Sequence, residues 1–273
     1  MSAGDWREVD PADLSPVVLV AGGFLTTPRL YGPMAASLRA RGAADVVIAP
    51  VYVPDWVLCA VRGLGPVTTR VGRALLRAGE ASAAGPSSRG APILVVGHSA
   101  GGIVGRLLTS PEPFEGRRLD ASGRIAALVT LGTPHLVGDE ARWGGRVATA
   151  GARFANRHVP GARFAPTTGY LAVASRYVVG QDEAEDGTPR LVRWLYEDVL
   201  PAPDQPIVAG DGLVPVASAL LPGARHIVLE DAVHGPGVRA PWYGGEGQLH
   251  AWWPAALEAW RDALRARQAL RAR

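Results

Sequence analysis

Apolar residues along the chain fall into two alternating patterns. Short continuous apolar runs occupy residues 17–23, 45–50, 93–99, 125–133, 176–180 and 226–231. Runs of this length are typical of strands that are buried on both faces of a parallel sheet. Between them, apolar residues recur at helical spacing and predict helices over 31–41, 67–79 and 100–109. This alternation predicts the α/β class, with a mostly parallel central sheet flanked by helices.

One long segment interrupts the alternation. Residues 136–175 lie between two predicted strands and carry widely spaced aromatic residues among many arginines and glycines. A segment of this length with apolar anchors predicts a cap-like insertion over the carboxyl edge of the sheet, although ordinary helix packing would give the same composition. No change in composition divides the rest of the chain, so residues 1–273 are expected to form a single domain that contains this insertion.

The basic residues of the chain are all of one kind. There are 28 of them, every one an arginine, against 25 acidic residues, which gives a net charge of +3. The absence of lysine excludes a phosphate-loop nucleotidase and a pyridoxal enzyme, because each needs a lysine for its chemistry. The arginines are scattered except in residues 261–273, where a solvated helix face explains them better than a contact with nucleic acid or anionic lipid. No nucleic-acid partner is therefore expected.

The N-terminal residues and the single cysteine indicate in which cellular compartment the protein is expected. Residues 1–20 carry acidic residues and prolines before any apolar run, unlike a secretory signal, and no apolar run reaches membrane-spanning length. Cys59 has no partner for an internal disulfide and lies in an apolar stretch, which predicts a small buried side chain. These features predict a cytoplasmic protein.

A glycine-flanked serine ends the predicted strand at 93–99. Gly97, Ser99 and Gly101 fit the G-x-S-x-G pattern, in which a sharp strand-to-helix turn exposes a nucleophilic hydroxyl above a sheet. The glycines are needed because a Cβ on either side would collide with the neighbouring strand and helix. The serine also opens the predicted helix at 100–109, whose amino terminus would favour an oxyanion. The alternative interpretation is a glycine-rich turn in which Ser99 only caps the helix.

Two motifs carry a family resemblance. With GHSAGG around Ser99 and LGTPH at 131–135, the chain resembles the lipase-like branch of the α/β-hydrolase superfamily over about residues 17–260. The resemblance implies the α/β-hydrolase fold and a nucleophilic serine followed along the chain by an acid and then a histidine. Asp211, in a GDGxVP stretch, resembles the acid of these lipases, and His234 lies on the loop after the next predicted strand. All three implied catalytic residues then stand at carboxyl ends of strands, where open α/β sheets gather functional groups.

The implied chemistry also needs donors for an oxyanion. The histidine takes the proton of the serine and returns it to the leaving group, while the aspartate holds the imidazole in the required tautomer. Backbone N–H groups stabilise the tetrahedral oxyanion, and the resemblance places them at Ala100, directly after the serine, and at Phe24, in the turn after the first strand. Related lipases usually carry His-Gly in that turn. This chain has Gly-Gly at 22–23 and so lacks the histidine that normally braces the loop.

Several other side chains compete for these roles. Asp231 is favoured as a turn or cap residue and Asp182 as part of a solvated loop. His250 opens the last helix and is favoured as a partly buried side chain. His98 points away from the nucleophile along its strand, which favours a structural role. For His135 two interpretations are open: its imidazole lines the acyl pocket as a substrate-binding residue, or it hydrogen-bonds the loop.

The sequence predicts no metal and no cofactor. Neither an H-E-x-x-H pattern nor a pair of cysteine ligands occurs, which argues against a catalytic zinc. The glycine pair at 22–23 does not have the spacing of a dinucleotide-binding turn.

Together these features predict a carboxylic ester hydrolase of the lipase or esterase kind that works through an acyl-serine intermediate. The resemblance favours small-molecule esters or lipids with apolar acyl groups, and a lipid substrate would bring transient contact with a membrane surface. A thioesterase, amidase or acyltransferase with the same triad is left open. A non-catalytic binding module on a hydrolase scaffold is left open too, as is the oligomeric state.

Overall fold

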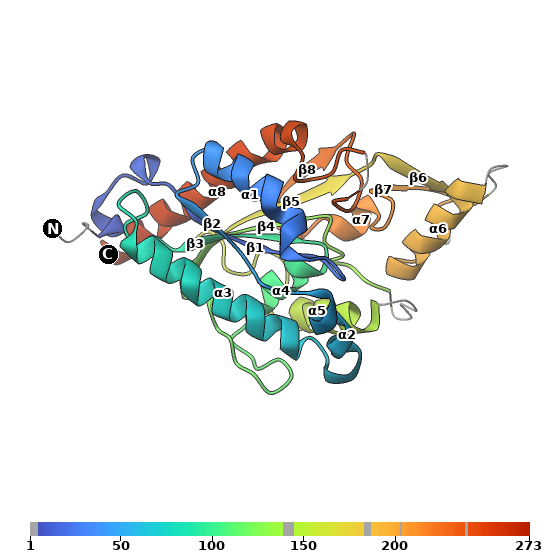
Figure 1. The fold of residues 1–273 in the computed structure, drawn as a ribbon, viewed down its shortest axis with the longest axis horizontal. Coiled ribbons are helices and arrows are strands. Elements are labelled where there is room, and N and C mark those ends of the chain that lie inside the picture. The colour runs from blue at the N-terminus through green and yellow to red at the C-terminus, as the bar shows by residue number, and fades with distance from the viewer. Residues whose placement is uncertain (1–4, 139–144, 183–186, 203, 238–239) are drawn as a thin grey trace.

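The centre of the molecule is a parallel sheet. The computed structural model describes residues 5–138, 145–182, 187–202, 204–237 and 240–273. Six strands lie in the order β2-β1-β3-β4-β5-β8, and every neighbouring pair is parallel (Figure 1). They are β1 (Val17–Ala21), β2 (Asp45–Ile48), β3 (Ile93–His98), β4 (Ile125–Leu131), β5 (Gly169–Ser175) and β8 (Arg225–Leu229). The mostly parallel central sheet that the apolar runs predict is confirmed.

Helices cover both faces of this sheet. α1 (Gly32–Ala40) and α8 (Glu246–Arg271) lie on one face, above the sheet in Figure 1, and α3 (Gly65–Ala84), α4 (Ala100–Leu108) and α5 (Gly145–His158) lie on the other. The remaining helical segments are α2 (Val53–Arg62), α6 (Gly187–Val199), α7 (Val216–Ala219) and the short 3-10 turns η1 (Trp6–Glu8), η2 (Pro11–Asp13), η3 (Pro28–Tyr31) and η4 (Ser122–Arg124). The predicted α/β layering is therefore confirmed.

Each central strand supplies two hydrophobic cores, because successive side chains of a strand point to opposite faces. In β1, Val18 and Val20 belong to the core formed with α1 and α8. Val17 and Leu19 belong to the core formed with α3, α4 and α5. This two-sided burial explains why the central strands are continuous apolar runs and show no alternation of apolar and polar residues.

A second, two-stranded sheet lies at one end of the molecule. β6 (Val178–Gln181) and β7 (Ile207–Gly210) pair antiparallel, and α6 packs beside them (Figure 1). The apolar run at 176–180 is thus not a strand of the central sheet, and that prediction is wrong. The central place belongs to β5, whose sequence GYLAVAS mixes glycine, alanine and serine with larger apolar residues. Such small residues give a weak strand signal, and β5 is a strand because β4 and β8 flank it.

The structure also corrects the predicted cap insertion at 136–175. Residues 139–144 lie outside the described residues. Further along, α5 packs Ala152 and Ala155 into the core that it shares with α4, and β5 is a central strand. The described part of this segment therefore belongs to the body of the fold, as the alternative of ordinary helix packing expects. The single domain over the whole chain stays a prediction.

The C-terminal helix is firmly packed. α8 buries Trp252, Trp253 and Trp260 against the sheet. Near its end, the Gln268 side-chain amide donates to the carbonyl oxygen of Val9 at 2.9 Å and so ties the N-terminal segment to the helix. In the part of the chain that the structure describes, no helix is long and apolar enough to cross a membrane.

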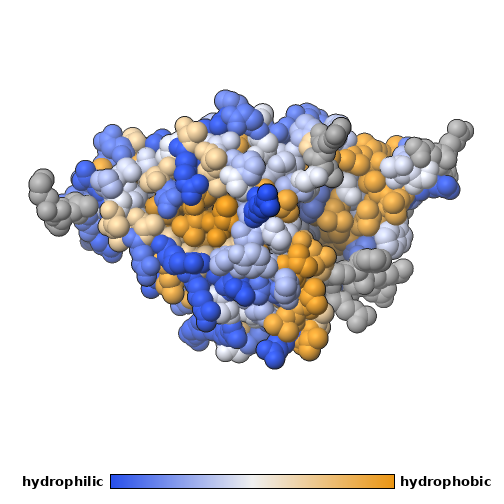
Figure 2. Space-filling view, in the orientation of Figure 1, coloured by the Kyte–Doolittle hydropathy of each residue, from blue (hydrophilic) through white to orange (hydrophobic). Residues whose placement is uncertain are grey.

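α2 has one buried face and one exposed apolar face. Trp56 and Cys59 are buried, which confirms the prediction for the cysteine. Val53, Val57 and Val61 lie on the outside at 38%, 61% and 85% exposure, and Figure 2 shows apolar residues gathered over this helix. This helix borders the loop that follows β1, because Trp56 contacts the Phe24 ring.

Candidate active site

Ser99 stands on a strained turn between β3 and α4. Its φ of 53° and ψ of −127° lie in a region that residues other than glycine rarely adopt. A Cβ added at Gly97 would lie 2.4 Å from the Cα of Gly102. One added at Gly101 would lie 2.1 Å from the carbonyl oxygen of Ala21. Helix and strands therefore approach so closely that only glycines fit beside the serine, and this packing holds Ser99 at the carboxyl edge of the sheet.

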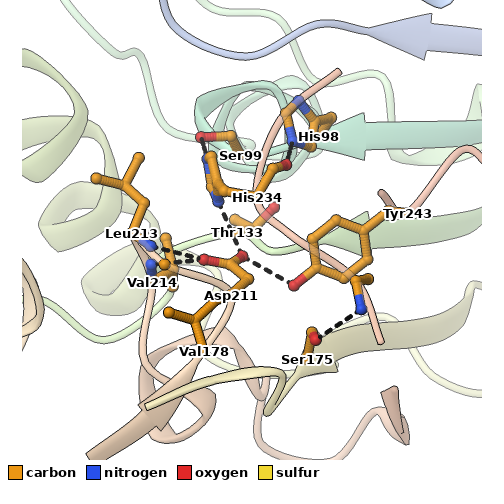
Figure 3. A network of polar contacts seen from close by, with 12 residues as sticks. His98, Ser99, Thr133, Ser175, Val178, Asp211, Leu213, Val214, His234 and Tyr243 are labelled. Carbon is orange, nitrogen blue, oxygen red and sulfur yellow. Dashed lines mark hydrogen bonds and ion pairs between the residues drawn. The ribbon is translucent and has the colours of Figure 1, made fainter. Parts of the chain in front are cut away.

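The Ser99 side chain points to a histidine and not to its own helix. Its hydroxyl makes no capping hydrogen bond to α4. Instead, Oγ lies 2.9 Å from Nε2 of His234 (Figure 3). The alternative in which Ser99 only caps the helix is therefore wrong.

His234 links the serine to an acid. Its Nδ1 lies 2.8 Å from Oδ2 of Asp211 (Figure 3). An ionised carboxylate only accepts, so Nδ1 carries the hydrogen and Nε2 is free to accept the Ser99 hydroxyl. The structure thus brings together the three side chains that the sequence analysis selected, although they lie on loops after three different strands, β3, β7 and β8.

The Asp211 carboxylate is buried and fully engaged. Its Oδ1 accepts the backbone N–H groups of Leu213 at 3.0 Å and Val214 at 2.8 Å. Burial raises the pKa of the carboxyl, but the charge of His234, its hydrogen bond and the two N–H groups outweigh burial and leave the pKa below its usual value of 3.8. The acid is therefore ionised at neutral pH, as an orienting partner for an imidazole must be.

Tyr243 completes the surroundings of the carboxylate. Its hydroxyl donates to Oδ2 of Asp211 at 2.8 Å (Figure 3). Burial, followed by the charge of Asp211, raises the pKa of this hydroxyl well above 10, so it stays protonated and keeps donating. Tyr243 was not predicted from the sequence, because no local pattern shows which hydroxyl reaches a carboxylate 32 positions away.

The two predicted oxyanion donors belong to segments that adjoin Ser99. Ala100 is the first residue of α4, and a Cβ added at Gly23 would lie 2.9 Å from the Cβ of Ser99, so the loop after β1 lies directly against the serine. Among the described residues, neither the Ala100 N–H nor the Phe24 N–H donates to another protein group. Both amides are thus free to bind a ligand atom, and their role as donors stays a prediction.

His135 lies deeper than a substrate-binding residue would. Its side chain is buried with no exposed surface. Nε2 lies 3.0 Å from the Thr130 hydroxyl and Nδ1 lies 3.5 Å from the Arg106 guanidinium, while Asn156 donates to its carbonyl oxygen at 2.8 Å. Burial, together with the charge of Arg106, lowers the pKa of the imidazole well below 6.5. These contacts favour the second interpretation, in which His135 holds the loop after β4.

The competing acids and histidines have other partners. Asp231 accepts the side-chain amide of Gln248 at 2.9 Å, and Asp182 pairs with Arg193 at 3.5 Å. Arg41 donates to the His250 ring at 3.1 Å, and this ring is exposed, so the expectation of a partly buried side chain is wrong. None of these contacts leads to Ser99, so Asp211 and His234 are the acid and the histidine that the geometry connects to the serine.

The candidate site consists of amino-acid side chains and backbone amides. Among the described residues, no group of three or more His, Cys, Asp or Glu side chains could hold a metal ion. The hydrogen-bonded chain from Ser99 to Asp211 can move the serine proton onto the imidazole without a bound group.

In sequence, no family model and no curated protein matches the chain. Among solved structures, the mature form of lipase BlEst2 from Bacillus licheniformis matches with a TM-score of 0.58 and 15% identity, over 93% of this chain and 94% of that one. The propeptide form of the same lipase matches with a TM-score of 0.56 and 15% identity, over 93% of this chain and 52% of that one. The apo form of esterase 2 from Thermogutta terrifontis gives a TM-score of 0.49 at 14% identity, over 92% and 83%.

The chain has the α/β-hydrolase fold. The match to the mature lipase over nearly the whole of both chains decides this, together with the parallel sheet and its two helical layers. In the α/β-hydrolase fold a nucleophile stands on the strand-to-helix turn above the sheet, with the acid and the histidine later in the chain. In this chain Ser99 stands on the turn between β3 and α4, and Asp211 and His234 follow β7 and β8 later in the sequence.

Proposed function

We propose that this chain is a serine hydrolase that cleaves carboxylic esters through an acyl-serine intermediate. The observation that carries the proposal is the place of His234, with Nε2 2.9 Å from Ser99 Oγ and Nδ1 2.8 Å from the Asp211 carboxylate. The fold supports it, since two structures of a lipase match this chain over 93% of its length. No cofactor or metal is required for this reaction.

In the first half of the reaction, Ser99 Oγ attacks the ester carbonyl carbon while Nε2 of His234 takes the serine proton. The resulting imidazolium is stabilised by Asp211. Collapse of the tetrahedral intermediate breaks the bond to the alkoxy oxygen, which receives the proton from Nε2 and leaves as the alcohol. Water then attacks the acyl-serine with its proton going to His234, and the carboxylic acid and the free serine are released.

The negative charge of the tetrahedral intermediate needs preorganised donors. The backbone N–H groups of Ala100 and Phe24 are the proposed donors. Ala100 follows Ser99 directly, and Phe24 follows Gly23, which lies against Ser99. Neither amide donates to another protein group among the described residues. In comparable sites, removal of one such donor costs about 3 kcal/mol of transition-state stabilisation.

Exposed apolar side chains on the loops that follow β1, β4 and β7 favour apolar acyl groups. Phe24 and Leu25 in the loop after β1 are 40% and 47% exposed, and the Phe24 ring packs edge-on against Trp56 of α2 with centroids 5.5 Å apart. Leu136 and Leu213, on the loops that follow β4 and β7, are 38% and 40% exposed. Exposed apolar residues on several loops of one sheet edge are typical of a site that binds an apolar ligand.

An ester series tests the proposal. Purified wild type is offered p-nitrophenyl esters of increasing acyl length, and its labelling by a fluorophosphonate is followed in parallel. We expect hydrolysis of these esters and labelling of Ser99, with both lost in Ser99→Ala. The matched control is Ser37→Ala, whose hydroxyl donates to Glu246 on the protein surface and is expected to have no effect.

The same experiment separates the alternatives. Thioesters and anilides of the same acyl group measure preference for sulfur or nitrogen leaving groups, and added alcohols measure acyl transfer. A wild type that hydrolyses none of these compounds and takes no fluorophosphonate label would favour a non-catalytic binding module. Activity or labelling that survives in Ser99→Ala would remove this serine from its role.

A further inference from the structure

A second chain of hydrogen bonds runs behind the Ser99 site. The Gly23 N–H donates to the hydroxyl oxygen of Tyr31 at 2.8 Å, and this hydroxyl lies 2.8 Å from Nδ1 of His98. On the far side of the same imidazole, Nε2 lies 2.6 Å from the backbone carbonyl oxygen of His234 (Figure 3). Three hydrogen bonds thus join the loop after β1 to the loop after β8.

The direction of these bonds follows from the acceptor at the far end. A carbonyl oxygen only accepts, so Nε2 of His98 carries the hydrogen and Nδ1 of the neutral ring is an acceptor. Burial, helped by the charge of His234, lowers the pKa of His98 to about 3, which keeps the ring neutral at pH 7. Burial raises the pKa of Tyr31 to about 12, so its hydroxyl keeps its proton. The Thr26 hydroxyl lies 3.1 Å from the Tyr31 oxygen, but Nδ1 of His98 lies closer, at 2.8 Å, and as an acceptor it takes the single tyrosine hydrogen.

This chain of hydrogen bonds is shielded from water. Tyr31 and His98 are each 1% exposed, and Trp242 packs edge-on against both rings with centroids 5.8 Å and 5.7 Å away. Tyr31 also fills the space beside Gly22, where an added Cβ would lie 2.7 Å from Cε2 of the tyrosine ring. Hydrogen bonds in such surroundings are stronger than in water, and a member that loses its partner is costly to leave unpaired.

Both ends of this hydrogen-bond series belong to the proposed active site. Gly23 precedes the proposed oxyanion donor Phe24, and His234 is the proposed base. We propose that Tyr31 and His98 are positioning residues that hold these two loops in register, so that donor and base act on the same acyl carbon. This proposal rests on the proposed ester hydrolase function. Misplacement of reacting groups by about 1 Å can slow a reaction about 100-fold, so a brace between two distant loops has a measurable effect.

Three variants remove or keep different hydrogen bonds of this series. Tyr31→Phe removes the hydroxyl and leaves the ring in place. His98→Asn keeps an oxygen near the position of Nδ1, which can still accept from Tyr31, and loses the donor to His234. His98→Gln places an amide N–H near the position of Nε2 and so keeps that donor. Tyr170→Phe is the control, because Tyr170 is a buried tyrosine, 7% exposed, in the opposite core.

The rate and the affinity for substrate are measured separately. With a short soluble ester we expect kcat to fall about 10- to 100-fold in Tyr31→Phe and in His98→Asn, with KM nearly unchanged. The inhibition constant of an aryl boronic acid, which forms a tetrahedral adduct with serine, is expected to rise together with the loss of kcat. His98→Gln should recover part of the rate. The double variant Tyr31→Phe/His98→Asn should be no slower than the slower single variant, because both act through one chain.

Several results would overturn the proposal. A normal kcat in Tyr31→Phe and His98→Asn, with only a lower thermal midpoint, would show that these hydrogen bonds contribute to stability and not to catalysis. Losses that multiply in the double variant would show that the two residues act separately. Nitrogen NMR of the wild-type imidazoles needs no activity, and a hydrogen on Nδ1 of His98 would contradict the assigned direction. A wild type without hydrolysis or labelling contradicts the proposed function itself, whereas an active wild type with fully active variants contradicts this proposal alone.

Discussion

The carbonyl oxygen of Asp211 accepts the backbone N–H of His234 at 2.8 Å, in addition to the 2.8 Å contact between their side chains. Asp211 follows β7 of the two-stranded sheet, whereas His234 follows β8 of the central sheet. The pair therefore fastens the two sheets together at the candidate site. Because the main-chain bond does not depend on the carboxylate, the loops stay joined when the aspartate side chain is changed.

This double contact makes Asp211→Asn an informative variant. An asparagine can turn its amide N–H₂ toward Nδ1 of His234, which favours the tautomer with hydrogen on Nε2 and stops that nitrogen from accepting the serine proton. We expect kcat to fall about 10⁴-fold with little change in KM. Steady-state kinetics with a short ester measures this, with Asp231→Asn as the control that keeps its rate. A nearly normal rate in Asp211→Asn would mean that another acid orients the imidazole.

The glycines beside Ser99 give a prediction about packing. In Gly101→Ala the new Cβ would lie 2.1 Å from the carbonyl oxygen of Ala21, so β1 or α4 must move. We expect a loss of about 1 to 3 kcal/mol in the free energy of unfolding, and lower activity because the Ser99 turn moves with α4. The matched control is Gly79→Ala in the middle of α3, where no atom lies within 4 Å of the new Cβ.

For Gly79→Ala the expected change has the opposite sign, a gain of about 0.5 to 1 kcal/mol, because alanine is the better helix residue. Urea unfolding and the ester assay on both variants check the pair. Equal stability of the two variants would contradict the close approach of α4 to β1.

Much of the fold and of the site could be predicted, because its apolar runs and its glycine-flanked serine are short patterns of neighbouring residues. The strands β1, β3 and β4 are buried on both faces, so their continuous apolar runs are visible without a structure. The Ser99 turn is marked by glycines that its steric demands require. Asp211 could be selected because its GDGxVP stretch resembles the lipase-like branch, and His234 because it lies on the loop after the last predicted strand. The structure places the two side chains in hydrogen-bond contact.

Other features depend on contacts between distant segments. β5 contains small residues, and its position is decided by β4 and β8 on either side. The hydroxyl groups of Tyr31 and Tyr243 reach His98 and Asp211 only in the folded chain, across 67 and 32 positions. A structural role for His98 follows from its place in the sequence, but the hydrogen bond from its ring to the loop of His234 is visible only in the folded protein.

A variant of His135 distinguishes its two interpretations, a side chain that stabilises the loop after β4 and a side chain that binds substrate. His135→Ala removes the ring that contacts the Thr130 hydroxyl and leaves a cavity beside Arg106. We expect the free energy of unfolding to fall by about 2 to 4 kcal/mol, while KM for short and long esters stays nearly unchanged. The control His250→Ala alters an exposed ring and should change stability by less than about 0.5 kcal/mol. A KM that rises with acyl length in His135→Ala, without loss of stability, would restore the substrate-binding interpretation.

Cys59 gives a prediction about alkaline stability. The thiol is 1% exposed, and burial raises its pKa from 9.0 to about 11. Because the folded pKa is higher than the unfolded one, the contribution of the thiol to the free energy of unfolding is complete below pH 9 and is lost as the pH rises toward 11. In urea unfolding, wild type should therefore lose stability more steeply than Cys59→Ala between these two pH values, with parallel curves below pH 9. Parallel curves over the whole range would mean that the thiol ionises equally in both states, which contradicts its burial.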